Sequence, residues 1–213
     1  MKAVIFDLDG VLVFTDRFHY KAWKKLADDM GIYFDQKINN RLRGISRMES
    51  LEIILENYRG EPLTSEKKEL LAEEKNKNYR KMLDTMTKED VSDEVRKTLI
   101  ELKRRGYLIA LGSSSKNAKF ILEKTQMTNL FDAVADGEII AKSKPDPEVF
   151  LKAAELLGIV PAECAVVEVA VSGIDAAKTA GMMAVGIGEA ERYEKTDIGI
   201  KRITDLLEVL KER

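Results

Sequence analysis

The sequence predicts an α/β fold: a doubly wound parallel (Rossmann-like) sheet with an inserted α-helical cap. Over residues 92–211, short apolar runs alternate with amphipathic stretches, which is typical of right-handed βαβ units. A first apolar run at 2–6 is separated from them by a highly charged stretch that has no strand-like run. We therefore expect an α/β core built from residues 1–14 and 88–213 and a cap domain at 15–87.

The expected elements of the core follow in chain order from this alternation. Each strand is a short, often β-branched apolar run that ends in Gly, Asp, Glu or a Ser-rich loop. Strands are expected at 2–6, 107–112, 133–135, 164–167 and 183–187, and helices at 92–105, 116–126, 146–157, 171–180 and 203–211. In the cap, apolar residues recur at helical spacing between Gly31, Gly44 and the Gly60–Pro62 turn, which predicts about four helices.

Composition excludes several classes of protein. The 213 residues carry 35 Lys and Arg against 37 Asp and Glu, so no excess of basic charge favours nucleic acid as a partner. No apolar run approaches the ~20 residues of a membrane span, and the aspartates at 7 and 9 come too early for a signal peptide. Cys164 is the single cysteine, so an internal disulfide or a Cys-based zinc site is excluded. We expect a soluble, cytoplasmic protein without membrane partners. We also expect a monomer, although the absence of heptads excludes only a coiled coil.

Polar residues follow the predicted strands where a parallel sheet binds its ligands, at the carboxyl ends. Asp7 and Asp9 come directly after the first strand, where two carboxylates could share a metal ion or divide the roles of nucleophile and acid. A solvated strand end that caps the next turn explains the pair equally well. Glu168 ends a later strand, where a metal ligand and a buried acid paired with Lys or a backbone N–H are equally favoured.

Two loops carry groups that could bind an anion. The Ser113–Asn117 loop offers hydroxyls and N–H groups at the start of a helix, although a serine that caps this helix explains it as well. Lys144 lies in a proline-stiffened loop, where an ammonium can hold a phosphate as a point charge. For an isolated lysine, a surface charge ahead of a helix with Pro147 in its first turn is the favoured explanation.

The order of these motifs is more specific than any of them alone. FDLDGV at 6–11, the Ser-rich strand end, KPDP at 144–147 and the acidic strand end before an Ala/Gly-rich helix resemble the haloacid dehalogenase superfamily of phosphoryl-transfer enzymes. The charged stretch after the first motif resembles that superfamily's mobile cap. Over essentially the whole chain, the sequence is similar to the β-phosphoglucomutase family within it, on these residues: His19, Trp23, Leu42–Arg47, Glu49–Leu51, Lys75–Asn76 and Ser113–Asn117.

The resemblance implies a role for each matching residue. Asp7 would be the nucleophile that forms an aspartyl-phosphate, and Asp9 the general acid/base. The transferring phosphate would be held by Ser113, the backbone around Ser114, and Lys144. The distal phosphate would be held by Arg47, Ser115, Lys116 and Asn117. Cap closure and sugar recognition would fall to His19, Trp23, Gly44, Ser50 and Lys75, although Trp23 alone reads equally well as a core anchor.

The resemblance also implies Mg²⁺, held by Asp7, the Asp9 carbonyl and Glu168, and glucose 1,6-bisphosphate as the activating intermediate. Val169 departs from the family pattern, which has a metal-ligating Asp directly after the acid that corresponds to Glu168. Mg²⁺ requires oxygen ligands, and valine supplies none. We therefore expect a reduced affinity for Mg²⁺.

The expected activity is the interconversion of β-glucose 1-phosphate and glucose 6-phosphate through the bisphosphate. Two alternatives remain open at the level of sequence. A sugar-phosphate phosphatase would use the same core residues with water as the acceptor, and a catalytically weak sugar-phosphate binder would explain Val169.

Overall fold

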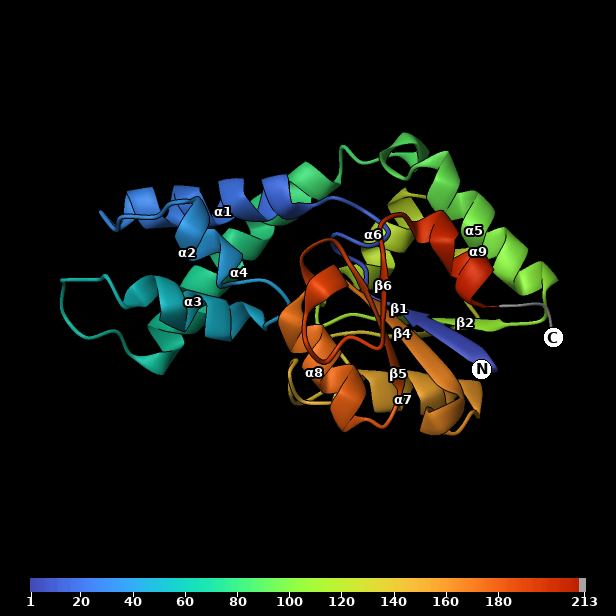
Figure 1. Ribbon diagram of the computed structural model, residues 1–213. Helices are drawn as coiled ribbons and strands as arrows, with labels where there is room; N and C mark the ends of the chain where they lie inside the picture. The colour runs from blue at the N-terminus through green and yellow to red at the C-terminus, as the bar shows by residue number, and fades with distance from the viewer. Residues whose placement is uncertain (211–213) are drawn as a thin grey trace.

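The computed structural model describes residues 1–210, and its centre is a six-stranded parallel sheet in the order β3-β2-β1-β4-β5-β6 (Figure 1). The predicted doubly wound fold is therefore confirmed. The strands are β1 (Ala3–Phe6), β2 (Leu108–Gly112), β3 (Ala133–Ala135), β4 (Cys164–Glu168), β5 (Met183–Ile187) and β6 (Ile198–Ile200).

The strand order reverses between β1 and β4, which are the two central strands. Phe6, the last residue of β1, pairs in register with Leu111 of β2 on one side and with Val167 of β4 on the other. Ligands of open α/β sheets bind outside the carboxyl ends of the strands at such a reversal. Asp7 follows Phe6 and Glu168 follows Val167, so these two residues lie side by side in one crevice.

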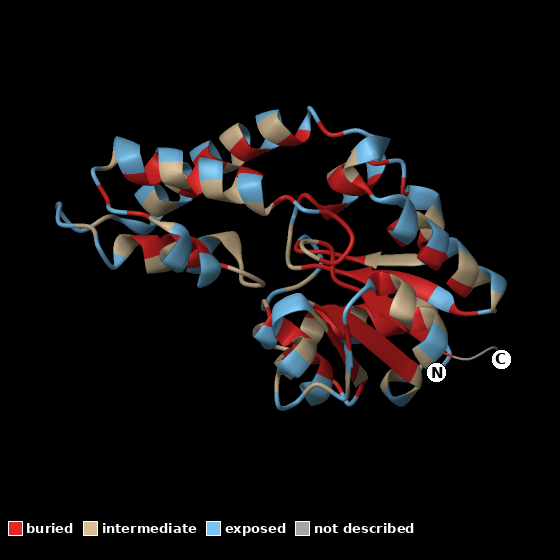
Figure 2. Cartoon of the chain, turned by 45° about the horizontal axis from the view of Figure 1, so that its top comes forward, coloured by how far each residue is buried: buried red, intermediate tan, exposed pale blue. Residues whose placement is uncertain are grey.

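Helices cover both faces of the sheet because side chains of a strand alternate between its faces. Val4 and Phe6 of β1 share a buried cluster with α5 (Asp93–Arg104), α6 (Ala118–Lys124) and α9 (Leu206–Val209). On the other face, Ala3 and Ile5 pack with α7 (Glu148–Leu157) and α8 (Val171–Thr179). Figure 2 shows the buried strands in red between helices whose outer sides are exposed.

Four helices of the described chain lie between β1 and α5 and extend to one side of the sheet (Figure 1): α1 (Asp16–Asp29), α2 (Gln36–Asn40), α3 (Arg47–Leu55) and α4 (Ser65–Leu83). They bury an apolar cluster of their own around Trp23, Leu51 and Ile54. This layer is the helical cap expected from the sequence. The exact division of the chain at residues 14/15 and 87/88 stays a prediction.

The structure differs from the sequence-based expectation near the C-terminus. Strand β6 was not expected, because its three residues, Ile-Gly-Ile, are too short for a periodic signal. The helix expected at 203–211 begins as a 3₁₀ turn, Ile203–Asp205, because the Asp205 carboxylate accepts hydrogen bonds from the N–H groups of Lys201 and Arg202. Its end at Lys211 lies outside the described residues.

The remaining short elements are 3₁₀ turns, at Lys88–Asp90, Thr128–Leu130, Pro161–Glu163 and Gly188–Arg192. Among the described helices, none has both the length and the apolar character needed to cross a membrane.

Candidate active site

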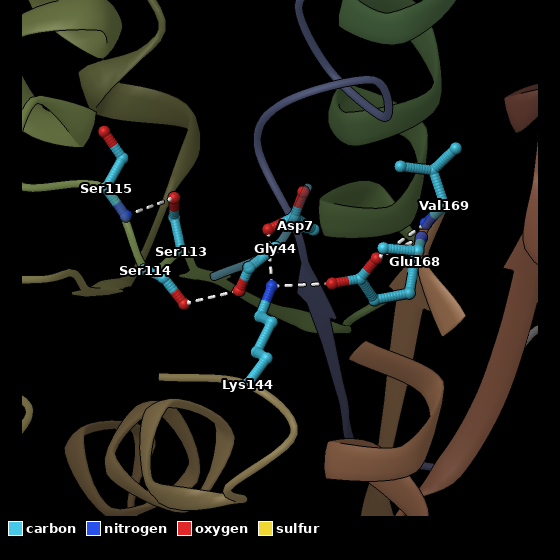
Figure 3. Close-up of polar contacts among 9 residues, drawn as sticks. Asp7, Gly44, Ser113, Ser114, Ser115, Lys144, Glu168 and Val169 are labelled. Atoms are coloured by element: carbon cyan, nitrogen blue, oxygen red, sulfur yellow. Dashed lines mark hydrogen bonds and ion pairs between the residues drawn. The ribbon is translucent and has the colours of Figure 1, made fainter. Parts of the chain in front are cut away.

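A buried ammonium joins the two central strands at their carboxyl ends (Figure 3). Lys144 Nζ lies 2.5 Å from Asp7 Oδ1 and 2.6 Å from Glu168 Oε1, and the Lys144 side chain is only 1% exposed. Burial lowers the pKa of Lys144, but the charges of Asp7 and Glu168 outweigh it and raise that pKa above its ordinary value. The favoured sequence explanation, a surface lysine, is therefore wrong for Lys144.

Glu168 is held from several directions, so it fixes Lys144 in place. Its second carboxylate oxygen, Oε2, accepts hydrogen bonds from the N–H groups of Val169 at 2.7 Å and Ala170 at 2.8 Å. Gly173 in α8 leaves room for this carboxylate, because a Cβ there would lie 1.9 Å from Glu168 Oε1. The geometry matches the sequence reading of a buried acid paired with Lys and backbone N–H groups.

Asp9 lies in the loop after Asp7, and its carboxylate accepts a hydrogen bond from the Thr15 hydroxyl at the entrance to α1. Burial raises the pKa of Asp9 to about 7, against the lowering effect of the Thr15 bond. A group with a pKa near the working pH can both donate and accept a proton efficiently. Thr15 was not singled out in the sequence, because nothing in its local context shows this tertiary contact.

The Ser113–Asn117 loop follows β2 beside this crevice (Figure 3). The Ser113 and Ser115 hydroxyls accept hydrogen bonds at 3.2 Å from the N–H groups of Ser115 and Asn117, respectively. The N-cap of α6 is Asn117 and it makes no side-chain cap bond, so the explanation of the loop as a serine cap is wrong. Lys116 is exposed at the rim of the loop.

In the cap, a second buried lysine lies among aromatic rings. Lys75 Nζ is 3.1 Å from His19 Nδ1, 4.5 Å from the centroid of the Trp23 ring and 4.7 Å from that of Tyr79. Burial and the nearby Arg47 lower the pKa of Lys75 to about 7, and burial with Lys75 lowers the pKa of His19 well below its usual value. The structure therefore brings together several predicted cap residues, together with Tyr79, which the sequence did not single out.

The other predicted cap residues lie in different settings. Trp23 is 2% exposed and belongs to the cap's apolar cluster, as expected for a core anchor. Its ring also contacts the ammonium of Lys75. The Ser50 hydroxyl donates to the Ser46 carbonyl at 2.9 Å within α3, so this bond joins it to its own helix. Burial lowers the pKa of Arg47 at the start of α3.

Polar contacts hold the cap against the core beside the crevice. The Ser114 hydroxyl donates to the Gly44 carbonyl at 3.3 Å, and Asn117 Nδ2 donates to Asn76 Oδ1 at 2.9 Å. Arg43 bonds Asp16 at the start of α1 and Glu189 of the core. The predicted residues Gly44, Ser114 and Asn117 therefore meet at the boundary between cap and core.

A cleft of about 730 Å³ opens at the same boundary. It is lined by Ser46 and Glu49 of the cap and by Lys142, Ser143 and Asp146 of the core loop that carries Lys144. Its volume lies within the roughly 300–1,000 Å³ range of small-molecule sites. The loop that places Lys144 at Asp7 therefore also forms one wall of an open cleft.

The carboxylates do not assemble the Mg²⁺ site that the resemblance implies. Among the described residues, no three Asp, Glu, His or Cys side chains gather so that they could hold a metal ion. Asp7 and Glu168 converge on the Lys144 ammonium, while the Asp9 side chain bonds elsewhere. The donor set does not fit the implied cation, and we derive no reaction step through it.

We expect Lys75→Met to raise the free energy of unfolding by on the order of 3 kcal/mol below pH 7, because a buried ammonium is destabilised by the loss of its hydration. The pKa of Lys75 is about 7 in the folded chain, against 10.5 without burial. Between these values the unfolded chain binds more protons, so wild-type stability rises with pH. The gain from methionine therefore shrinks above pH 7, which urea unfolding at pH 6.5 and 9.5 measures.

The exposed Lys77→Met serves as the matched control on the same helix. Equal stabilisation by Lys75→Met at both pH values would contradict the assignment of the penalty to the buried charge. This gain is a net figure: lowering the pKa from 10.5 to about 7 corresponds to about 5 kcal/mol, and loss of the contacts with Trp23 and Tyr79 takes back about 1 kcal/mol for each ring.

Comparison with known proteins places this arrangement in a family. The haloacid dehalogenase-like hydrolase family matches residues 1–181. A β-phosphoglucomutase of Bacillus subtilis is 44% identical over 214 residues, which cover 100% of this chain and 95% of the relative. A phosphorylated carbohydrates phosphatase of Thermotoga maritima is 30% identical and covers 100% of this chain and 99% of its own length.

Among solved structures, the crystal structure of β-phosphoglucomutase from Clostridium difficile superposes with a TM-score of 0.92. It is 39% identical in sequence and covers 98% of this chain and 95% of its own. The likeness includes the cap as well as the sheet, since nearly the whole of both chains is aligned. Asp7, Lys144 and Glu168 lie together where the strand order reverses. On the family match and the 44% identity over the whole chain, the protein belongs to the haloacid dehalogenase-like hydrolases, a family of enzymes.

Proposed function

We propose that this chain is a β-phosphoglucomutase, which interconverts β-glucose 1-phosphate and glucose 6-phosphate through glucose 1,6-bisphosphate. The observation that carries this proposal is the contact of buried Lys144 with Asp7 at the switch point, with Asp9 in the loop that follows. The similarity of the whole chain, cap included, to relatives of that name supports the substrate.

The chemistry is transfer of one phosphoryl group in two directions. An Asp7 carboxylate oxygen attacks the phosphorus of the bisphosphate, the bond from phosphorus to the sugar oxygen breaks, and Asp9 gives its proton to that oxygen. In the reverse sense, a sugar hydroxyl attacks the aspartyl-phosphate, Asp9 takes the hydroxyl proton, and the Asp7 carboxylate is released. Positioned oxygens and neutralised charge supply most of the catalysis in such transfers.

Each remaining site residue has a binding role in this proposal. Lys144 neutralises charge at the transferring phosphate, and Ser113 and Ser114 surround it. Arg47 suits the distal phosphate, because a guanidinium can bind phosphate through two parallel hydrogen bonds. That phosphate is also assigned to Ser115, Lys116 and Asn117, and the sugar to His19, Trp23, Gly44, Ser50 and Lys75.

The cap decides whether a sugar hydroxyl or water accepts the phosphoryl group. The contacts from Gly44 to Ser114 and from Asn76 to Asn117 close the boundary of cap and core beside the serine loop. Exclusion of water protects the aspartyl-phosphate while the bisphosphate reorients. The second candidate is a sugar-phosphate phosphatase, which the similarity to the Thermotoga maritima phosphatase favours.

The deciding experiment offers β-glucose 1-phosphate and a catalytic amount of glucose 1,6-bisphosphate to the chain, with and without Mg²⁺, and quantifies glucose 6-phosphate and inorganic phosphate together. A mutase forms glucose 6-phosphate in excess of phosphate. Dominant phosphate release would establish the phosphatase instead. Binding without either product would leave a sugar-phosphate binder.

Asp9 should control the pH dependence of the second half of the reaction. Because its pKa is about 7, we expect kcat/KM for β-glucose 1-phosphate to rise about tenfold per unit below pH 7 and to level off above it. Asp9→Asn should lower kcat/KM by about 10²–10⁴-fold and remove this rise. A profile of unchanged shape in Asp9→Asn, measured from pH 6 to 9, would show that another group titrates.

We further propose that the enzyme works as a cytoplasmic monomer on small sugar phosphates. Its buried single cysteine, Cys164, suits a reducing compartment, and the catalytic groups described above all come from one chain. Light scattering at working concentration tests the monomer.

A further inference from the structure

Val169 occupies a defined position at the edge of the crevice, directly after Glu168. A Cβ at Gly10 would lie 3.0 Å from Val169 Cγ1, and a Cβ at Gly188 would lie 3.1 Å from Cγ2. The isopropyl group therefore lies between the loop after β1 and the loop after β5. An apolar side chain therefore fills the space where the chain leaves β1, β4 and β5.

Both carboxylate oxygens of Glu168, and one each of Asp7 and Asp9, are engaged with protein groups. Glu168 Oε1 contacts Lys144, and Oε2 accepts two backbone N–H bonds. Asp7 Oδ1 contacts the same ammonium, and the Asp9 carboxylate bonds Thr15. Enzymes of this family are in general Mg²⁺-dependent, but Mg²⁺ needs near-octahedral oxygen ligands, which this crevice does not present.

Lys144 places a positive charge beside Asp7, the proposed nucleophile. Two of the three N–H bonds of its ammonium point to Asp7 and Glu168, and one remains for an incoming oxygen. Lys144 Nζ also lies 4.7 Å from the centroid of the Phe150 ring of α7, which packs against the ammonium. The ammonium is thus fixed where a phosphate oxygen must arrive to meet Asp7.

We propose that in this chain Val169 removes the divalent-cation subsite, and that Lys144 alone carries the positive charge to which a phosphate binds at Asp7. The proposal rests on the proposed function only for the identity of the phosphate ester. It predicts that phosphate affinity is the same with and without Mg²⁺. It also predicts that Val169→Asp creates a cation site. The affinity for Mg²⁺ or Mn²⁺ should increase by about 100-fold, which is the scale of the effects that single residues have on metal affinity at protein sites.

The test uses Mn²⁺ as a paramagnetic substitute for Mg²⁺, so that binding is read directly from the loss of the free-ion signal in electron paramagnetic resonance. Wild type and Val169→Thr should leave the free Mn²⁺ signal unchanged at concentrations that saturate Val169→Asp. Threonine is the matched control, because it keeps the β-branched shape and adds no carboxylate. Wild type that binds Mn²⁺ as tightly as Val169→Asp would overturn the proposal.

A second measurement uses wild type alone, so it stands even where Val169→Asp fails to fold. The melting temperature is followed with increasing inorganic phosphate, once in Mg²⁺ and once in EDTA. Equal stabilisation in both solutions is expected. A larger shift in Mg²⁺, or no shift in either, would contradict the proposal. Neither measurement involves turnover, so a failure of the mutase assignment would not affect their outcome.

Discussion

Asp7→Asn is expected to lower kcat by about 10⁴-fold or more and to abolish covalent phosphorylation of the chain, because an amide cannot form the aspartyl-phosphate. Asp7 is only 8% exposed, and its backbone N–H donates to the Val167 carbonyl at 3.0 Å, so the variant keeps its position in the sheet. Intact-protein mass after incubation with glucose 1,6-bisphosphate and an acid quench measures the covalent step.

The control is Asp93→Asn, an exposed aspartate at the start of α5. It should be phosphorylated like wild type. Phosphorylation of Asp7→Asn at the same rate as wild type would assign the nucleophile to another residue. Circular dichroism of the variant checks that the fold is retained.

Lys144→Met should be the most destabilising single change in the site. It leaves the Asp7 and Glu168 carboxylates buried without their shared cation, which costs about 3–5 kcal/mol when one partner of a buried ion pair is removed. We also expect inorganic phosphate to lose its stabilising effect. Urea unfolding of the variant measures the first effect, and the melting temperature with phosphate measures the second.

Two further variants isolate the cause of this loss. Lys142→Met removes a lysine whose side chain is 73% exposed in the same loop and should change stability by less than about 0.5 kcal/mol. The double variant Lys144→Met with Glu168→Gln should recover part of the stability, because it removes one uncompensated charge. Equal stability of Lys144→Met and wild type would contradict the claim that Lys144 stabilises the buried carboxylates of Asp7 and Glu168.

The sequence predicted much of the sheet because its strands are continuous apolar runs, and the carboxyl ends of parallel strands meet in space. Asp7 and Glu168 could therefore be placed together although 161 positions separate them. Strand β6 escaped prediction because three residues give no periodicity, and the last helix began as a 3₁₀ turn because of the Asp205 side chain.

The site was less predictable than the fold. Lys144 lies well past the end of β3 in a loop with the local context of a surface lysine, so the residues alone favoured a surface charge over a phosphate ligand, and only the structure shows its burial. Thr15 was missed because its bond to Asp9 joins the start of α1 to the loop after β1. Tyr79 lies one helical turn after Lys75 in α4, but its contact with His19 of α1 crosses between helices and has no local signal. The position of Val169 beside Gly10 and Gly188 likewise depends on loops far apart in sequence.

The central claim is that phosphoryl groups pass through Asp7 to a sugar hydroxyl in preference to water. The direct measurement is the partition of the phosphorylated chain, prepared from labelled glucose 1,6-bisphosphate, between added β-glucose 1-phosphate and water. We expect most of the label to appear in sugar bisphosphate and glucose 6-phosphate. Label that appears as inorganic phosphate at an unchanged rate when the sugar phosphate is added would contradict the mutase.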